Sequence, residues 1–127
     1  DKTTDKDAVL GVFCTSPAIR NPVYNMLTEI IGTFILAFGA LSMSKSAQSL
    51  GALDALPVGF LVLAIGLSMG GPTGYAINPA RDLGPRIMHM ILPISGKRDS
   101  DWGYAFVPML GPLIGACLGV AAYQALH

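Results

Sequence analysis

Long uncharged stretches alternate with short polar ones along this chain. Residues 21–44 contain a single charged side chain, Glu29. The stretches 55–80 and 102–126 contain none. Each stretch is as long as the roughly 20 residues that an α-helix needs to cross the hydrocarbon core of a bilayer. The pattern therefore predicts three membrane-spanning helices, at about residues 23–44, 55–70 and 105–126.

The first 22 residues have a different composition. Charged side chains occupy five of the first seven positions, and Pro17 and Pro22 follow. A turn-rich, charged segment of this kind is typical of a loop. We therefore expect residues 1–22 to form a loop or linker ahead of the first span. A basic start followed by a short apolar stretch and a small-residue cleavage site is absent, so a signal peptide is not predicted.

The second apolar stretch is interrupted at Gly70, Gly71 and Pro72, which together predict a helix break and a loop over residues 70–78. Asn78 and Pro79 then have the form of a helix start, because Asn caps helices well and Pro is favoured at the first helical position. A helix from Pro79 to about residue 90 rises roughly 18 Å, well short of a 30 Å hydrocarbon core. A half-length helix is therefore predicted over residues 79–91.

A half-length helix after Gly-rich backbone is tolerated at membrane depth only where its free N–H and C=O groups line water or are buried in protein. Arg81 lies three residues past Asn78. Its charge is costly at such a depth unless the side chain faces an aqueous cavity. These features favour a pore or a transport site over the alternative, a surface helix between two spans.

Composition narrows the class of protein. The chain has 127 residues, a formal net charge of 0 and 13% charged side chains, whereas soluble domains carry roughly 25%. With 52% hydrophobic residues, disorder is also excluded. No basic run is present, so nucleic-acid binding is not expected. Cys14 and Cys117 lie far apart with no second ligand at metal spacing, and we expect no disulfide framework, no metal site and no cofactor.

The segment 70–86, Gly-Gly-Pro-Thr-Gly-Tyr-Ala-Ile-Asn-Pro-Ala-Arg-Asp-Leu-Gly-Pro-Arg, resembles the second signature loop of the aquaporin family. More narrowly, it resembles the glycerol-conducting branch, the aquaglyceroporins or glycerol uptake facilitators. The family fold has two inverted repeats, each with three spanning helices and one half-helix. The resemblance implies an all-α membrane protein and places residues 23–127 in the second, carboxyl-terminal repeat, with a re-entrant loop at 70–78.

Single positions support this branch. Gly66, twelve residues before the signature Asn, stands where water-selective members usually carry His. Asp82 directly follows Arg81, and Pro108 lies in the last span, as in the glycerol branch. Ser16 departs from the pattern, because that branch often has Tyr before Pro17.

The resemblance also implies roles for individual residues. The selectivity filter would consist of Arg81, Tyr75 and Gly66. The pore-lining signature would comprise acceptor carbonyls, the donating amide of the signature Asn and the two residues after it, namely Gly74, Tyr75, Ala76, Ile77, Asn78, Pro79 and Ala80. An apolar wall would face the hydrocarbon edge of the permeant, with Leu61 and Ile65 as candidates.

Three further charged residues are predicted to support this site. Glu29 matches the family's Glu-x-x-x-Thr pattern and would accept hydrogen bonds from the loop 70–78; the alternatives are a glutamate that snorkels to the interface or is protonated in the core. Asp82 and Arg86, at i and i+4, would pair along the half-helix and hold Arg81 in place.

We therefore expect passive conduction of glycerol, other small uncharged solutes and water, without catalysis. The charge of Arg81 and the half-helix N-terminus would exclude cations and protons. The expected partners are an N-terminal aquaporin repeat that completes the pore, further complete subunits in a homotetramer, and the lipid bilayer. The protein would be multi-pass in the cell membrane. The resemblance implies that residues 1–22 and the loop 93–103 lie outside and the carboxyl terminus inside, although the basic residues of that loop favour the cytoplasm.

Two other functions stay open at this point. A secondary transporter half would also use a discontinuous helix, and a channel fragment alone would be inactive. The other residues that the sequence singles out are interpreted as packing or anchoring groups, with no contact to a permeant. These are the glycines Gly32, Gly39, Gly111, Gly115 and Gly119, the histidines His89 and His127, and the aromatic anchors Trp102 and Tyr104.

Overall fold

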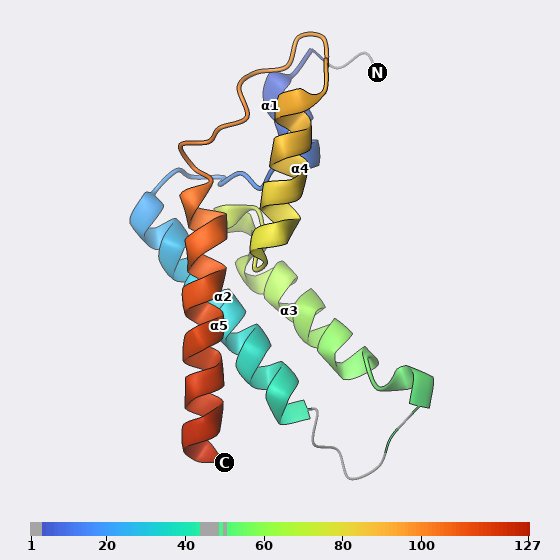
Figure 1. Ribbon diagram of the computed structural model, residues 1–127, viewed down its shortest axis with the longest axis vertical. Coiled ribbons are helices and arrows are strands. Elements are labelled where there is room, and N and C mark those ends of the chain that lie inside the picture. The colour runs from blue at the N-terminus through green and yellow to red at the C-terminus, as the bar shows by residue number, and fades with distance from the viewer. Residues whose placement is uncertain (1–3, 44–48, 50) are drawn as a thin grey trace.

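The computed structural model describes residues 4–43, 49 and 51–127, and within these ranges it consists of helices and loops (Figure 1). The helices are α1 (Lys6–Phe13), α2 (Pro22–Met43), the short 3₁₀ helix η1 (Gly51–Leu53), α3 (Leu56–Thr73), α4 (Pro79–Ile91) and α5 (Phe106–Leu126). The predicted all-α fold class is confirmed. Three helices, α2, α3 and α5, are long and apolar enough to cross a membrane. The predictions for residues 1–3 and 44 lie outside the described residues.

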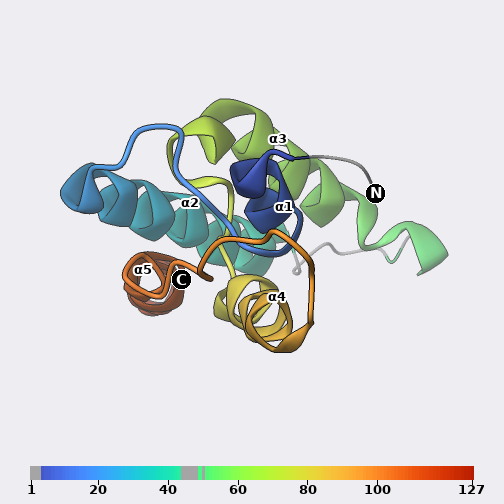
Figure 2. The same ribbon diagram turned by 90° about the horizontal axis from the view of Figure 1, so that it is seen from above.

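The helix α2 lies at the centre of the arrangement. Seen from above, α3 lies on one side of α2, and α4 and α5 lie on the other (Figure 2). The shorter α4 begins near mid-height of the molecule, close to the end of α3, and runs to the end that also carries α1 (Figure 1). The loop between α4 and α5 returns along this same end. The site described below lies where α3 ends and α4 begins.

Glycines allow α5 to pack closely on α2. A Cβ added at Gly111 would lie 2.6 Å from the Cβ of Glu29, and one added at Gly119 would lie 2.8 Å from the carbonyl oxygen of Phe34. Small residues at four-residue spacing let two membrane helices approach backbone to backbone. The predicted packing role of this glycine stripe is confirmed.

The contact between α2 and α3 is built on two other glycines. The side chain of Leu61 occupies the space beside Gly39, and that of Ile65 lies beside Gly32. Ile65 is buried. The expectation that Ile65 forms the apolar wall of a pore is therefore wrong, because its side chain packs into the interface with α2.

The helix α3 continues through the predicted break and ends at Thr73. Pro72 falls in the last helical turn, where its missing N–H removes one hydrogen bond without stopping the helix. The turn is closed by the Gly74 N–H, which donates to the Gly70 carbonyl at 2.9 Å. Gly74 then adopts φ 81°, the left-handed conformation typical of a helix C-terminus. The non-helical loop is therefore 74–78, shorter than the predicted 70–78.

The segment 1–22 was expected to form a loop, yet it contains the helix α1. Asp5 caps this helix by accepting hydrogen bonds from the N–H groups of Asp7 and Ala8, at 2.9 and 3.2 Å. Leu10 is buried at 2% exposure. A cap and one buried apolar side chain outweigh the loop-like composition, and α1 packs beside α4.

We predict that Gly115→Ala destabilises the protein, because the added methyl group would collide with the Ile30 carbonyl and lie 3.0 Å from the Cβ of Thr33. Overpacking of this kind costs about 1–3 kcal/mol. The measurement is thermal unfolding in detergent micelles. The control is Gly59→Ala, whose added methyl group meets no atom within 4 Å and should leave stability unchanged or slightly raised. Equal unfolding temperatures for the two variants would contradict the packing described here.

Candidate functional site

The loop 74–78 has an unusual backbone. Tyr75 and Ile77 have φ values of 62° and 42°, and Gly74 has 81°. Left-handed conformations cost non-glycine residues roughly 1–3 kcal/mol each and persist only where the surroundings impose them. A Cβ at Gly74 would also lie 2.6 Å from the backbone nitrogen of Ser16. Gly74 is therefore required both by its conformation and by the close approach of the segment around Ser16.

Glu29 holds this loop from the side of α2. Its Oε1 accepts from the N–H of Ala76 at 3.1 Å and its Oε2 accepts from the N–H of Ile77 at 2.7 Å. The carboxylate is 1% exposed, so it does not snorkel to an interface. The expected contact between Glu29 and the loop is present. Hydrogen bonds to a charged acceptor contribute about 1.5–3 kcal/mol each, enough to offset the strain of the loop.

The helix α4 starts as predicted. Asn78 is its N-cap, with Oδ1 accepting from the N–H of Ala80 at 2.9 Å, and Pro79 occupies the first helical position. Because Oδ1 is engaged within the helix, the Nδ2 amide is the part of this side chain that can serve a ligand.

The three predicted filter residues lie together. Nη1 of Arg81 donates to the carbonyl oxygen of Tyr75, and the Arg81 guanidinium carbon lies 5.4 Å from the centroid of the Tyr75 ring. The same ring covers Gly66, where an added Cβ would come 3.0 Å from Tyr75 Cζ. The Tyr75 hydroxyl donates to the Val62 carbonyl on α3. The ring is therefore held between α3 and the guanidinium.

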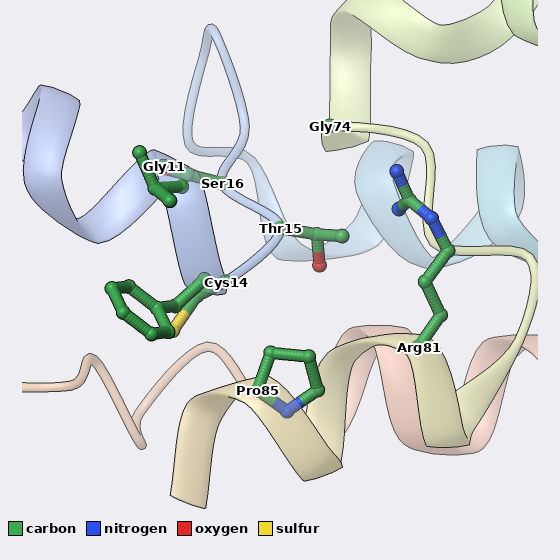
Figure 3. Close-up of a pocket in the computed structure, with 9 residues that line it drawn as sticks. Gly11, Cys14, Thr15, Ser16, Gly74, Arg81 and Pro85 are labelled. Carbon is green, nitrogen blue, oxygen red and sulfur yellow. The ribbon is translucent and has the colours of Figure 1, made fainter. Parts of the chain in front are cut away.

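An open pocket of about 370 Å³ lies beside this group. In Figure 3 the Arg81 side chain extends from α4 toward the backbone near Gly74. Thr15 lies across from it, on the segment that follows α1. The lining is mixed, with Ser16 contributing a polar group and Pro85 an apolar surface. The full lining consists of Gly11, Val12, Phe13, Cys14, Thr15, Ser16, Gly74, Arg81 and Pro85.

Asp82 and Arg86 form the predicted ion pair, and it is fully buried. The Nε and Nη2 atoms of Arg86 lie 2.7 and 2.8 Å from the two carboxylate oxygens of Asp82, and neither side chain is exposed. The expectation that this pair holds Arg81 differs from what is found, because Arg81 bonds to Tyr75 instead. The two residues lie on the buried face of α4, whereas Arg81 lies on the exposed face.

The pair instead fastens two loops to α4. Asp82 accepts from the backbone N–H and the hydroxyl of Thr15, at 2.8 and 2.6 Å. Arg86 donates to the carbonyls of Thr15, Ser100 and Asp101, at 3.1, 2.6 and 2.9 Å. A buried arginine with this many acceptors joins the segment before α2 to the segment before α5.

Several residues at the end of the molecule that carries α1 and the α4–α5 loop were not singled out in the sequence. Lys97 donates through Nζ to the carbonyls of His89, Met90 and Leu92 and thereby caps the C-terminus of α4. Arg20 pairs with Asp101. The position of Lys97 a few residues after the end of α4 could have indicated this cap. The contact depends on the conformation of the loop, however, which the sequence pattern does not determine.

The structure contradicts the prediction for Tyr104 and agrees with the interpretation of His89 as a packing group. Tyr104 is buried, with its ring under the Arg20 guanidinium at 5.4 Å, so it is not an interfacial anchor. His89 is fully buried, with Nδ1 2.8 Å from the Ser100 hydroxyl. Burial, followed by the nearby charges of Lys97 and Arg86, lowers the pKa of His89 below its ordinary value.

Within the described ranges, no group of three or more His, Cys, Asp or Glu side chains lies close enough to hold an ion.

The fold and site together define a membrane protein in which three long apolar helices accompany a half-length helix that starts from a left-handed loop. A family model described as Major intrinsic protein matches residues 2–123. The chain therefore belongs to the major intrinsic protein family, that of the aquaporins.

Three similar proteins are named as glycerol uptake facilitators. The chain is 59% identical over 123 residues to a probable glycerol uptake facilitator protein of Thermotoga maritima, covering 97% of this chain and 52% of that relative. It is 53% identical over 124 residues to glycerol uptake facilitator protein 3 of Lactiplantibacillus plantarum, covering 98% and 51%. It is 54% identical over 123 residues to the glycerol uptake facilitator protein of Bacillus subtilis, covering 97% and 44%. The chain thus spans about half the length of these curated relatives.

Glu29→Gln tests the support of the loop. The amide cannot accept from both N–H groups, and its own NH₂ would face one of them, so we expect a stability loss of about 2 kcal/mol or more. Thermal unfolding in micelles gives the measurement. Thr28→Ala is the matched control, because the Thr28 hydroxyl donates within its own helix, to the Tyr24 carbonyl. An unfolding temperature of Glu29→Gln equal to that of the wild-type chain would refute the support role.

Arg86→Met tests the buried ion pair. Removing one partner leaves Asp82 charged and unpaired in a buried site, which costs about 3–5 kcal/mol. We expect a large drop in the unfolding temperature, and a smaller one in the double variant with Asp82→Asn. The control is Arg98→Met, which breaks a surface pair with Asp7 and should have little effect. The buried pair would not be the fastening of the loops if both variants unfolded at the same temperature.

Proposed function

We propose that this chain is the carboxyl-terminal half of a passive channel that conducts glycerol, other small uncharged solutes and water. The observation that carries the proposal is the grouping of Arg81, Tyr75 and Gly66 beside an open pocket at the start of a half-length helix. The names of the relatives support glycerol as the permeant.

The polar wall of the path would come from the loop and α4. Glycerol presents hydroxyl groups along one edge and C–H groups along the other, so it needs donors and acceptors on one wall only. Arg81 would donate to its hydroxyls, and the amide of Asn78 would donate further in. The carbonyls of the loop 74–77 would accept; the N–H groups of Ala76 and Ile77 are already used by Glu29. Pro79 and Ala80 would close the turn from which Asn78 projects.

The width of the path would be set by Tyr75 and Gly66. The ring lies against the bare backbone of Gly66, so its position depends on the absence of a side chain there. A larger residue at this position would push the ring toward the guanidinium of Arg81 and narrow the gap.

Charge would exclude ions. Arg81 carries a fixed positive charge, and the N-terminus of α4 adds about half a charge of the same sign. Cations and protons would therefore meet a barrier, and a narrow path lined by carbonyls cannot replace the water shell of an anion. No bond is made or broken in such conduction, and the protein would act as a channel rather than an enzyme.

Glu29, Asp82 and Arg86 would act as structural supports, the first for the carbonyl loop and the other two for the outer loops. Residues 23–127 would form the carboxyl-terminal repeat, and residues 1–22 would precede it outside the cell. An N-terminal repeat would complete the pore, and complete subunits would assemble as a homotetramer in the cell membrane, each crossing it several times.

The test joins this chain to the part of the Thermotoga maritima relative that it does not match. The chimera, the chain alone and empty liposomes are compared in a glycerol swelling assay. We expect glycerol-driven swelling for the chimera only, without saturation at low glycerol and without dependence on an ion gradient. Swelling of the chimera no faster than that of empty liposomes would refute the channel, and flux driven by an ion gradient would favour a transporter.

Gly66→His in the chimera tests the width of the path. The imidazole would displace the Tyr75 ring, so we expect glycerol permeability to fall about tenfold or more while water permeability falls less. Stopped-flow light scattering with glycerol and with sucrose gradients measures the two rates. Gly59→Ala, on the same helix but with free space around it, should leave the ratio unchanged. An unaltered ratio in Gly66→His would contradict the role of this position.

A further inference from the structure

His89 is enclosed at the outer end of α4. Its side chain has no exposed surface. Nδ1 lies 2.8 Å from the Ser100 hydroxyl, and the ring packs against Phe13 with 5.5 Å between ring centroids. Within the described part of the chain, Nε2 is buried and has no hydrogen-bond partner. The ring therefore has one polar contact and one unsatisfied nitrogen.

This enclosure suits the neutral ring. If Nδ1–H donates to Ser100, then Nε2 carries only a lone pair, and an unused acceptor costs less than an unused donor. A protonated ring would bring a second N–H and a positive charge to the same place. Both would lack a partner in the enclosed state.

The charged groups around the ring also oppose protonation. Lys97 bonds to the His89 carbonyl itself, and Arg86 lies one turn earlier on α4. Asp82 already pairs with Arg86. Asp99 is the nearby carboxylate that favours the proton, but it bonds to Arg98 and to the backbone N–H of Asp101. On α1, Asp7 pairs with Arg98.

Phe13 connects this ring to the candidate pore. It ends α1 and is followed by Cys14, Thr15 and Ser16. Thr15 is bonded to Asp82, and the backbone of Ser16 lies directly on Gly74, the first residue of the loop that positions Tyr75. A displacement of Phe13 therefore reaches the loop through a segment of three residues, all of which line the pocket.

We propose that His89 is a proton-sensitive latch at the outer mouth: the neutral ring holds the segment 13–16 against α4, and proton uptake from outside releases that segment and lowers conduction. The conduction part of this inference rests on the proposed function. The release of the segment does not, because it concerns this chain alone.

The direction of the pH effect follows from proton linkage. A base whose pKa is lowered in the closed state binds fewer protons there than in the released state. The closed state is therefore fully populated when the pH is above the ordinary histidine pKa of about 6.5, and its population falls progressively as the pH drops below that pKa. Acid on the outer side would release the segment 13–16 and lower conduction, and neutralisation would restore both.

The first experiment follows the Thr15 amide by hydrogen exchange in the lipid-embedded chain, with rates corrected for intrinsic exchange. Between about pH 7.5 and pH 5 we expect its protection to fall about threefold or more in the wild-type chain. In His89→Asn the fall should be absent, since the Asn amide can still reach Ser100 but cannot take up a proton. The control His127→Gln removes the other histidine of the chain, which is exposed, and should behave as wild type.

The second experiment measures glycerol permeability of the chimera at the same two pH values. We expect a reversible fall of about threefold or more at low pH, absent in His89→Asn and retained in His127→Gln. If the chimera conducts at neither pH, the proposed function fails, and hydrogen exchange alone decides whether the latch exists.

The latch is refuted if Thr15 protection is the same at both pH values, or if its pH dependence persists in His89→Asn. Should His89→Asn fail to fold, NMR titration of the wild-type ring replaces it. A His89 that titrates at or above about 6.5, in the range of a free ring, would equally overturn the proposal.

Discussion

The two hydrogen bonds from the N–H groups of Ala76 and Ile77 to Glu29 are the interaction on which the rest of the site depends. A left-handed loop between two apolar segments has backbone donors that lipid cannot satisfy. A single carboxylate accepts both. It can lie there because Gly111 of α5 has no side chain, so that α5 passes directly against the Cβ of Glu29. One glycine thus makes room for the carboxylate, and the carboxylate fixes the loop.

A second constraint acts at the end of the molecule that carries α1 and the α4–α5 loop, where loops rather than helices must be held. Asp82 and Arg86 provide this by bonding to backbone groups on both sides, including Thr15 and Ser100. Lys97 caps the last carbonyls of α4. The half-length helix α4 is too short to be held by packing across the full thickness of a bilayer. It is held instead by the Asn78 cap at its start, by the bonds of Asp82 and Arg86 along its buried face, and by Lys97 at its end.

Much of this arrangement could be predicted from the sequence. Uncharged runs and the Asn-Pro start located the long helices and α4 to within a few residues, and the lone Glu29 in an apolar run implied a buried acceptor. The continuation of α3 through Pro72 could not be predicted, because one lost hydrogen bond near a helix end is tolerated. Neither could α1, whose charged composition conceals a cap at Asp5, nor the enclosure of His89, which depends on a loop folding back over α4.

The periodicity of α4 explains why two arginines five residues apart behave differently. Asp82, Arg86 and His89 follow one another at helical spacing and have no exposed surface, whereas Met88 and Ile91 are 46% and 64% exposed. Apart from Arg81, the charged side chains of this helix are turned inward, and the large apolar side chains of its C-terminal half are exposed, the reverse of a helix on a soluble protein. Such a helix is stable only where apolar surroundings cover these exposed apolar side chains and where every buried charge has partners. Arg86 has these partners. Within the described residues, the Arg81 guanidinium on the exposed side contacts the carbonyl and the ring of Tyr75, and under the proposed function its remaining donors would bond to a solute.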